Sequence, residues 1–328
     1  MKILLYQTAF LGDLILTTPL IQSIKETFPG SYLSVISKPF GKEVLKNNPY
    51  VDELITFDKR RDSNTQLIKK IYKRFDVAIS PHRSHRASYT LFLAGIPKRV
   101  GFNRGGFSFL YTDTVPHWFD GTHEIDRNLS LLTVFEEFSM EKASRTPSLY
   151  LSEEEDSFYK NLGLENKNYI IIAPGSKWKT KRWTAKGFFE LSKELSKEFR
   201  VVFIGSVEDR GFMGQILSFG SLEVLDLIGK TNLRESFSLI KHSKLLISND
   251  SSPVHMAVAF GTWVIDIYGP TVRDFGFYPY RNGVIIEAEG LKCRPCGLHG
   301  HNICPLGTHE CMERIDPKTV IKSVREIL

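Results

Sequence analysis

The stretch LLISNDSSPVHMAVAFGT, residues 245–262, decides the fold class because it leads from a short apolar run directly into a helical pattern. An uninterrupted apolar run such as 245–248 is typical of a strand that is buried on both faces. Past Asp250, Pro253 occupies a place that the first turn of a helix tolerates, and helix-periodic apolar residues follow it. The stretch therefore predicts a βα unit of a parallel sheet.

Similar runs recur along the chain, separated by segments of helix length. Continuous rather than alternating apolar runs favour parallel strands covered by helices, so we predict an α/β protein. The other runs are 2–6, 33–36, 54–57, 77–80, 169–173, 201–205, 224–228 and 264–268.

The length of 328 residues suits two domains of about 150 residues each. The βα pattern pauses near 147–168, where Ser152 and Glu155 have the spacing of a capping box. We predict two doubly wound Rossmann-like domains, 1–160 and 161–328, whose parallel sheets face each other across a cleft. Asp316 followed by proline predicts the cap of a final helix, and ligands are expected at the carboxyl ends of the strands.

Basic residues are concentrated in the first half. Residues 59–104 contain twelve Lys or Arg and only two Asp. Such an excess predicts an anionic partner, either nucleic acid, a membrane surface or a phosphorylated small molecule. A solvated helix face around 69–74 explains a part of these charges, whereas HRSHR at 82–86 follows a strand-like run.

The amino-terminal apolar run does not have the pattern of a signal peptide. Gln7, Thr8, Gly12 and Asp13 interrupt it, and no small-residue cleavage site follows. No run approaches the roughly 20 apolar residues of a membrane span. We expect a cytoplasmic protein.

Two strand ends have the composition of phosphate-binding turns. With Ser252 as N-cap, the backbone N–H groups of Val254, His255 and Met256 have no partner within the helix, and such an end attracts phosphate. The alternative is that Ser252 only caps the helix and His255 is a surface residue. The second turn, IIAPGSKWKTKRW at 171–183, combines a glycine that permits close approach with several lysines that can neutralise a phosphate.

Glu208 and Thr231 each follow a strand-like run. An acid or hydroxyl there is placed to accept from ribose hydroxyls, as in dinucleotide-binding folds, although either is equally a plain loop residue.

Together these segments resemble the ADP-heptose lipopolysaccharide heptosyltransferase family, which are glycosyltransferases of the GT-B type. The resemblance covers nearly the whole chain and implies a first domain for the acceptor and a second for the nucleotide sugar. It also implies that catalysis requires no metal or other cofactor. The matching segments are GDLILTTP at 12–19, GIPKRVGF at 95–102, APGSKWKTKRW at 173–183, NDSSPVHMAVAFGT at 249–262 and YGPT at 268–271.

The resemblance assigns the general base to Asp13, beside Gly12 in the acceptor site. An apolar setting excludes water and raises the basicity of a carboxylate, which suits a group that takes a proton from the acceptor hydroxyl. The alternative is that Asp13 caps the following helix.

The resemblance also implies an inverting transfer of heptose from ADP-heptose, with the leaving ADP stabilised by Lys181 and by a helix end. The implied donor-binding residues are Ser176, Lys177, Lys181, Glu208, Thr231, Asp250, Ser251, Ser252 and His255. In the family pattern around the pyrophosphate, Ser251 and Ser252 replace Thr and Gly.

The implied acceptor is an anionic lipid A core, and the candidate contacts are Arg83, Arg86 and Arg99. Peripheral contact with the inner face of the membrane follows from such an acceptor. Three alternatives remain: a protein acceptor of the autotransporter type, a nucleic-acid-binding α/β protein, and a sugar-nucleotide epimerase. Against nucleic acid, the basic residues are not interleaved with stacking aromatics, and we expect no such partner.

The four cysteines lie close together in the sequence. Cys293, Cys296, Cys304 and Cys311 have spacing that is compatible with a structural zinc or iron site. Four reduced thiols or a labile disulfide are the alternatives. The segment is similar to a Cys-rich segment of heptosyltransferases that modify autotransporter proteins.

Overall fold

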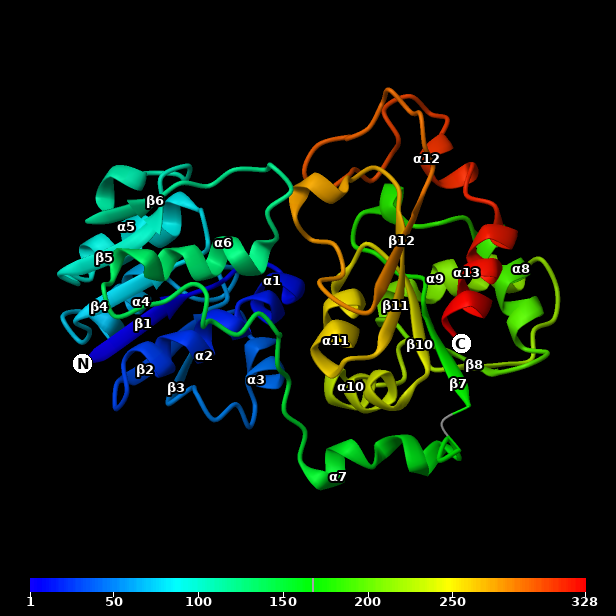
Figure 1. Cartoon of the computed structure of the whole chain (residues 1–328), viewed down its shortest axis with the longest axis horizontal. Coiled ribbons are helices and arrows are strands. Elements are labelled where there is room, and N and C mark those ends of the chain that lie inside the picture. The colour runs from blue at the N-terminus through cyan, green and yellow to red at the C-terminus, as the bar shows by residue number, and fades with distance from the viewer. Residues whose placement is uncertain (167) are drawn as a thin grey trace. The chain divides into compact units, whose positions relative to one another are not determined.

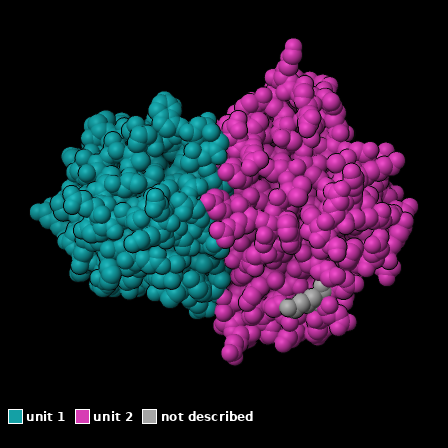
Figure 2. Space-filling model, viewed as in Figure 1, with its two compact units in different colours: residues 1–150 teal, residues 151–328 magenta. Residues whose placement is uncertain are grey.

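The computed structural model describes residues 1–166 and 168–328 and divides into two compact units, Met1–Tyr150 and Leu151–Leu328 (Figure 2). Each unit contains one six-stranded parallel sheet with helices between successive strands (Figure 1). The predicted α/β class is therefore confirmed. No helix in the described part of the chain is both long and apolar enough to cross a bilayer.

In unit 1 the strand order is β3-β2-β1-β4-β5-β6, and all pairs are parallel. The strands are β1 (Lys2–Tyr6), β2 (Tyr32–Ser37), β3 (Glu53–Thr56), β4 (Val77–Ser80), β5 (Lys98–Phe102) and β6 (Asp113–Val115). The helices are α1 (Leu11–Leu16), α2 (Thr18–Thr27), α3 (Gly41–Val44), α4 (Asn64–Ile71), α5 (His85–Leu93), α6 (Glu124–Ser130) and the 3-10 helices η1 (Ser108–Leu110) and η2 (Leu131–Val134).

In unit 2 the order is β12-β11-β10-β7-β8-β9, again with parallel pairs. The strands are β7 (Tyr169–Ala173), β8 (Arg200–Phe203), β9 (Val224–Asp226), β10 (Leu245–Asn249), β11 (Trp263–Tyr268) and β12 (Gly283–Glu287). The helices are α7 (Glu153–Asp156), α8 (Ala185–Leu195), α9 (Arg210–Leu217), α10 (Leu233–His242), α11 (Ser252–Phe260), α12 (Glu310–Glu313) and α13 (Pro317–Ile327). The 3-10 helices are η3 (Phe158–Leu162), η4 (Lys179–Lys181), η5 (Val207–Asp209) and η6 (Arg273–Phe275).

Each of the nine apolar runs identified in the sequence overlaps a strand, but β5, β6 and β12 were not predicted. Their sequences explain this. β5 begins with two basic residues and β6 is only three residues long, so neither has a continuous apolar run. β12 has a run of only three apolar residues, 284–286, and is exposed over most of its length.

Helix starts follow local capping rules. In the predicted capping box, the Glu155 backbone N–H donates to Ser152 Oγ and the Ser152 N–H donates to Glu155 Oε2. The predicted cap of the last helix is also present, since the Lys318 N–H donates to Asp316 Oδ1 at 2.9 Å and Pro317 begins the helix.

The core of unit 2 occupies the sheet face covered by α8, α9 and α13. Ile170, Ile172, Ile265 and Ile267 point to this face and pack with Trp183, which is fully buried. The indole N–H of Trp183 donates to the Ile315 carbonyl at 3.2 Å, so the largest buried side chain keeps its polar group satisfied.

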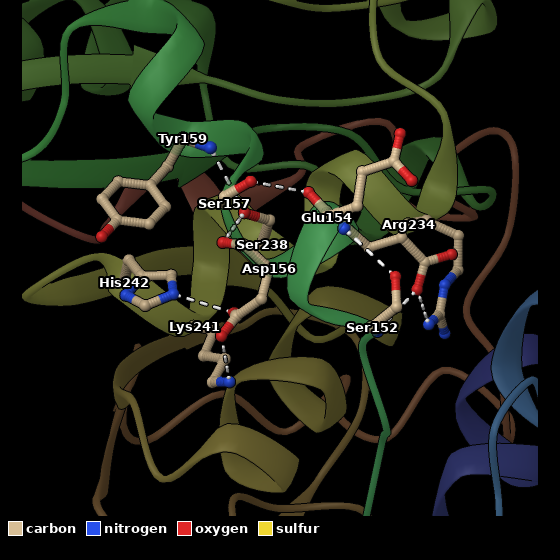
Figure 3. A network of polar contacts seen from close by, with 10 residues as sticks. Ser152, Glu154, Asp156, Ser157, Tyr159, Arg234, Ser238, Lys241 and His242 are labelled. Atoms are coloured by element: carbon tan, nitrogen blue, oxygen red, sulfur yellow. Dashed lines mark hydrogen bonds and ion pairs between the residues drawn. The ribbon is translucent and has the colours of Figure 1, made fainter.

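The segment after Leu151 is held against α10 of unit 2 by a polar network (Figure 3). The Asp156 carboxylate lies 2.8 Å from both Lys241 Nζ and His242 Nε2. Arg234 forms an ion pair with Glu155, and the Tyr159 and His242 rings stack at 4.0 Å. These contacts make the segment a part of unit 2, so the division falls at residue 150 and not at the predicted residue 160.

Candidate active site

In unit 1, Asp13 lies just beyond the carboxyl end of β1. The chain leaves the sheet after Tyr6 and enters α1, in which Asp13 is the third residue. The Phe10 backbone N–H donates to Asp13 Oδ2 at 3.0 Å, so the capping role considered from the sequence is present. Capping occupies one carboxylate oxygen with one donor and leaves the group available for further contacts.

Burial raises the pKa of Asp13 above its ordinary value. The Phe10 N–H and the positive charges of Lys38 and Arg83 oppose this shift without cancelling it. No cation in the described residues forms an ion pair with Asp13. A half-buried carboxylate of raised pKa and no fixed counterion has the properties of a general base.

A second buried acid lies near Asp13. Glu124, at the start of α6, forms an ion pair with Arg127 at 2.8 Å, and both side chains are buried. The pKa of Glu124 is raised to about 7, mainly by burial, while the charge of Arg127 opposes the rise and the charge of Asp13 adds to it. The guanidinium groups of Arg83 and Arg127 lie 5.1 and 5.2 Å from the centre of the Phe119 ring.

The predicted acceptor residues are only partly brought together. Gly12 is buried beside Asp13, and Arg83 acts electrostatically on both Asp13 and Glu124. Arg86 is the second residue of α5, which follows the carboxyl end of β4, and its guanidinium lies 5.9 Å from the Phe57 ring.

Arg99 has a different position. It is the second residue of β5, near the amino end of that strand, and its guanidinium donates to the backbone carbonyls of Ile96 and Leu110 at 2.5 and 2.8 Å. The structure does not bring Arg99 to Asp13. Its guanidinium is engaged by these backbone carbonyls and does not face the site.

Sequence reasoning missed Glu124, Arg127 and His82. The ring Nδ1 of His82 is 3.0 Å from Thr8 Oγ1, next to the loop that precedes Asp13. The segment HEIDR at 123–127 contains a signal in hindsight, because an acid and an arginine three residues apart share one helix face.

In unit 2, the loops after β7 and β10 are tied together at the carboxyl edge of the sheet. Asn249 accepts from the Trp183 backbone N–H at 2.8 Å and donates to the Pro174 carbonyl at 2.7 Å. A Cβ on Gly175 would lie 2.4 Å from the Asp209 carboxyl carbon, so this position requires glycine.

Lys181 and Asp250 form the centre of this edge. Lys181 Nζ is 2.5 Å from Asp250 Oδ2, and Thr271 Oγ1 donates to the same oxygen at 2.6 Å. Burial alone would raise the pKa of Asp250, but the ion pair with Lys181 and the hydrogen bond from Thr271 lower it. Lys181 also donates to the Asp250 carbonyl at 3.3 Å, which leaves one of its three N–H groups for a ligand.

The other predicted donor residues lie along the same edge. Ser176 is buried and its carbonyl accepts from Arg182 Nε at 2.9 Å. The Lys177 ammonium lies 5.5 Å from the centre of the Trp178 ring. His255 is buried on α11, where its charge acts on Asp250.

The two candidate ribose contacts follow the strands beyond β7. Glu208 is exposed in η5 after β8, and Thr231 Oγ1 is 3.1 Å from Ser236 Oγ in the loop after β9. Because the order β10-β7-β8-β9 is continuous, both residues are at the edge that holds Lys181.

The predicted start of α11 was wrong by one residue. Ser251 is the N-cap, with extended backbone, and Ser252 is the first helical residue. The Val254 N–H donates to the Ser251 carbonyl at 3.1 Å, and the N–H groups of His255 and Met256 fall within the helix. The backbone donors available to an anion at the start of α11 are therefore the N–H groups of Ser251 and Ser252.

The predicted metal site is not formed. Among the described residues, no group of three or more His, Cys, Asp or Glu side chains is arranged to hold a metal ion, and Cys293, Cys296, Cys304 and Cys311 are free thiols. Cys311 is buried on α12, while the other three are half-buried in the preceding loop.

The Cys-rich loop instead contacts the segment that contains Lys181. The Thr180 hydroxyl donates to the His301 carbonyl at 2.7 Å, and His309 Nε2 is 2.9 Å from the Thr180 carbonyl. The rings of Trp178 and His299 stack at 6.3 Å. The loop thus holds η4 in place and with it Lys181.

Comparison with known proteins gives the class. The family model described as glycosyltransferase family 9 (heptosyltransferase) matches residues 64–301. Lipooligosaccharide heptosyltransferase 2 of Haemophilus influenzae is 26% identical over 352 residues, which cover 100% of this chain and 99% of that protein.

Solved structures show the same fold. A family 9 glycosyl transferase from Veillonella parvula has a TM-score of 0.87 at 23% identity, covering 99% of this chain and 96% of that one. ADP-heptose lps heptosyltransferase II of E. coli has a TM-score of 0.78 at 24% identity, covering 100% and 98%. This chain is a glycosyltransferase with the predicted GT-B fold. It belongs to glycosyltransferase family 9, the heptosyltransferase family, and the resemblance noted from its motifs is confirmed.

Proposed function

We propose that this enzyme transfers heptose from ADP-heptose to an anionic acceptor of the lipopolysaccharide inner core, with inversion at the anomeric carbon. The proposal rests on the family and on one observation above all: Asp13 is a half-buried carboxylate of raised pKa at the carboxyl edge of its sheet. The relatives named as heptosyltransferases of lipooligosaccharide and lipopolysaccharide support the substrate class.

In the proposed step, Asp13 takes the proton of the acceptor hydroxyl while its oxygen attacks the anomeric carbon of the donor. The bond between that carbon and the β-phosphate oxygen breaks, and ADP leaves with the electron pair from the opposite face. General-base assistance of this kind contributes about 10²–10⁴ in rate. Protein around the carboxylate reduces the water that would otherwise hydrolyse the donor.

Unit 2 binds the donor. The remaining N–H of Lys181 and the N–H groups at the start of α11 stabilise the charge that develops on the diphosphate. Ser176, Lys177, Ser251, Ser252 and His255 are the further candidate contacts to the phosphates and sugar. Glu208 and Thr231 are placed for the ribose hydroxyls. In this proposal Asp250 fixes the position of Lys181.

Unit 1 binds the acceptor. Arg83 and Arg86 contact its phosphate or carboxylate groups, and Gly12 lets the sugar approach the backbone beside Asp13. The enzyme works in the cytoplasm in peripheral contact with the inner membrane, where a lipid-linked acceptor is held. No metal or other cofactor takes part in this proposed reaction.

Release of ADP tests the proposal. ADP-heptose is offered with and without lipid A core acceptors, and the native chain is compared with Asp13→Asn. We expect release only with acceptor, a loss of about 10²–10⁴ in kcat for Asp13→Asn, and ADP affinity within about twofold of native. Glu137→Gln, an exposed carboxylate in the same unit, is the matched control and is expected to keep native turnover. Near-native turnover of Asp13→Asn would remove the base assignment.

A further inference from the structure

Large apolar side chains are exposed over α5 and the segment before β6. Tyr89, Phe92 and Leu93 are 44%, 46% and 39% exposed on α5, and Phe107 and Phe109 are 48% and 79% exposed around η1. Soluble surfaces rarely gather aromatic residues in this way unless they bind something. These five residues are called the α5–η1 face below.

Contacts within unit 1 make this face continuous. Tyr89, Phe92 and Leu93 have the three- and four-residue spacing that places them on one side of a helix. The Phe107 ring lies 6.0 Å from the ring of His85 in the first turn of α5 and 5.8 Å from that of Phe109.

Arg99 joins the other end of the face. Its guanidinium lies 5.5 Å from the Phe92 ring and donates to the Leu110 carbonyl at 2.8 Å. In Figure 1, α5 lies beside the strands β5 and β6 between which η1 occurs.

The segment that contains the face carries charged side chains of one sign. Residues 77–112 contain no Asp or Glu, although they contain five Lys or Arg. Arg104, three residues before Phe107, is exposed, and its guanidinium lies 3.5 Å from the centre of the Trp118 ring. At the far end, the Lys73 backbone N–H donates to the Ala94 carbonyl at 2.8 Å, which places that lysine next to Leu93.

We infer that the α5–η1 face docks on an anionic lipid bilayer. Aromatic side chains favour the interface between head groups and acyl chains, and each nearby Lys or Arg adds attraction to anionic lipids. The basic character distinguishes this face from a plain apolar dimer contact. Since α5 begins two residues after Arg83, a docked enzyme would receive a lipid-linked acceptor near Asp13. The role of docking in acceptor delivery rests on the proposed function, but binding to vesicles is measurable without any substrate.

Co-sedimentation with vesicles tests the docking without any substrate. The full chain is mixed with vesicles of phosphatidylglycerol and phosphatidylethanolamine or with vesicles of phosphatidylcholine alone. We expect binding to the anionic vesicles that weakens with salt, and at least about tenfold weaker binding to phosphatidylcholine. The double variant Phe92→Gln/Phe109→Gln is expected to bind the anionic vesicles at least about tenfold more weakly than native.

The matched control is Ile303→Gln/Leu306→Gln in unit 2, where two apolar side chains are 82% and 65% exposed. It is expected to bind vesicles as the native chain does. Native binding by Phe92→Gln/Phe109→Gln, or no binding of the native chain to anionic vesicles, would overturn the inference. So would light scattering that shows a dimer which the double variant abolishes, because a second copy would then cover the face.

Activity separates this inference from the proposed function. With a delipidated, soluble acceptor, the double variant is expected to release ADP at the native rate, and with the lipid-linked acceptor in vesicles its rate is expected to fall with its binding. Failure of every acceptor would contradict the proposed reaction while the vesicle result stands. Equal loss on both acceptors would show that the face acts in catalysis and would overturn the docking role.

Discussion

Asp13 in unit 1 and Asp250 in unit 2 both lie at the carboxyl edge of a parallel sheet, yet their surroundings move their pKa values in opposite directions. Burial raises the pKa of Asp13, and only backbone N–H groups of Phe10 and of Asp13 itself and two cations at a distance oppose this. Burial acts on Asp250 too, but Lys181 at 2.5 Å and Thr271 at 2.6 Å lower its pKa.

The difference shows how one residue type performs two tasks. A carboxylate that binds a proton more readily is suited to accept one from a sugar hydroxyl. A carboxylate fixed as an anion is suited to orient a lysine toward a diphosphate. The contact that separates the two tasks is the direct ion pair, which Asp250 has and Asp13 lacks.

The largest expected effect follows from removing that ion pair. In Lys181→Met, Asp250 stays buried without its cation, and breaking a buried pair in this way costs about 3–5 kcal/mol. We expect the free energy of unfolding, measured by urea titration, to fall by that amount at neutral pH. Because the pKa of Asp250 is lowered, the pair stabilises the fold above pH 3.8 and the difference shrinks as the pH falls below it.

The double variant Lys181→Met/Asp250→Asn separates stability from binding. It has no unpaired charge, so it is expected to regain most of the lost stability while still binding ADP weakly. An unchanged unfolding curve for Lys181→Met would show that Asp250 does not depend on the lysine. The contrast with Asp13 would then be lost.

The edges of both sheets were predictable from the sequence. Each of the nine apolar runs overlaps a strand, and residues that directly follow such strands reach the carboxyl edge by the geometry of a parallel sheet. Asp250 directly follows such a strand, whereas Asp13 and Lys181 were named from the resemblance and lie in the segments after β1 and β7. The roles of all three stay predictions. Local capping rules also located Ser152 and Asp316 correctly.

The partners of these residues were not predictable, because they come from distant segments. Lys181 and Asp250 are paired across 69 positions of the chain. Arg99 has the charge of an acceptor contact, but its place near the start of β5 directs it to backbone carbonyls. Cysteine spacing alone says nothing of the fold of the loop, which turns its residues toward Thr180.

A third acid, Asp266, sharpens the comparison because its carboxylate is buried without a hydrogen bond from the described residues, and the charge of Lys181 lowers its pKa without cancelling the effect of burial. It is fully buried in β11 and paired in register with Ser248, and neither of its carboxylate oxygens has a hydrogen-bond partner among the described residues. Burial raises its pKa well above 3.8, and the nearby charge of Asp250 adds to the shift.

Replacing Asp266 by valine is expected to stabilise the enzyme by about 1–3 kcal/mol at neutral pH, because an unsatisfied polar group leaves the core and a good strand former enters. The raised pKa means that the native chain loses stability as the pH rises from 3.8 through the folded-state pKa. The gap between variant and native chain should therefore widen with pH in thermal unfolding. The isosteric Asp266→Asn is the control and is expected to remove the pH dependence alone. A destabilised valine variant would mean that Asp266 has a polar role.

The smallest expected effect concerns the acid that lies near Asp13. Glu124 ionises at a pH of about 7, and its negative charge then makes Asp13 more basic. We expect kcat/KM for ADP release to rise through pH 7 by less than about tenfold in the native enzyme, since a more basic carboxylate accepts the proton more readily.

In Glu124→Gln this rise is expected to be absent, while the fall of activity at lower pH, which Asp13 determines, remains. Arg127 loses its partner in the variant, so thermal unfolding is measured beside the pH profile to separate a loss of fold from a change in titration. Glu137→Gln should keep both steps. If the variant still shows the step near pH 7, that titration belongs to another group. The pKa of Asp13 would then depend on burial and the nearby cations and not on Glu124.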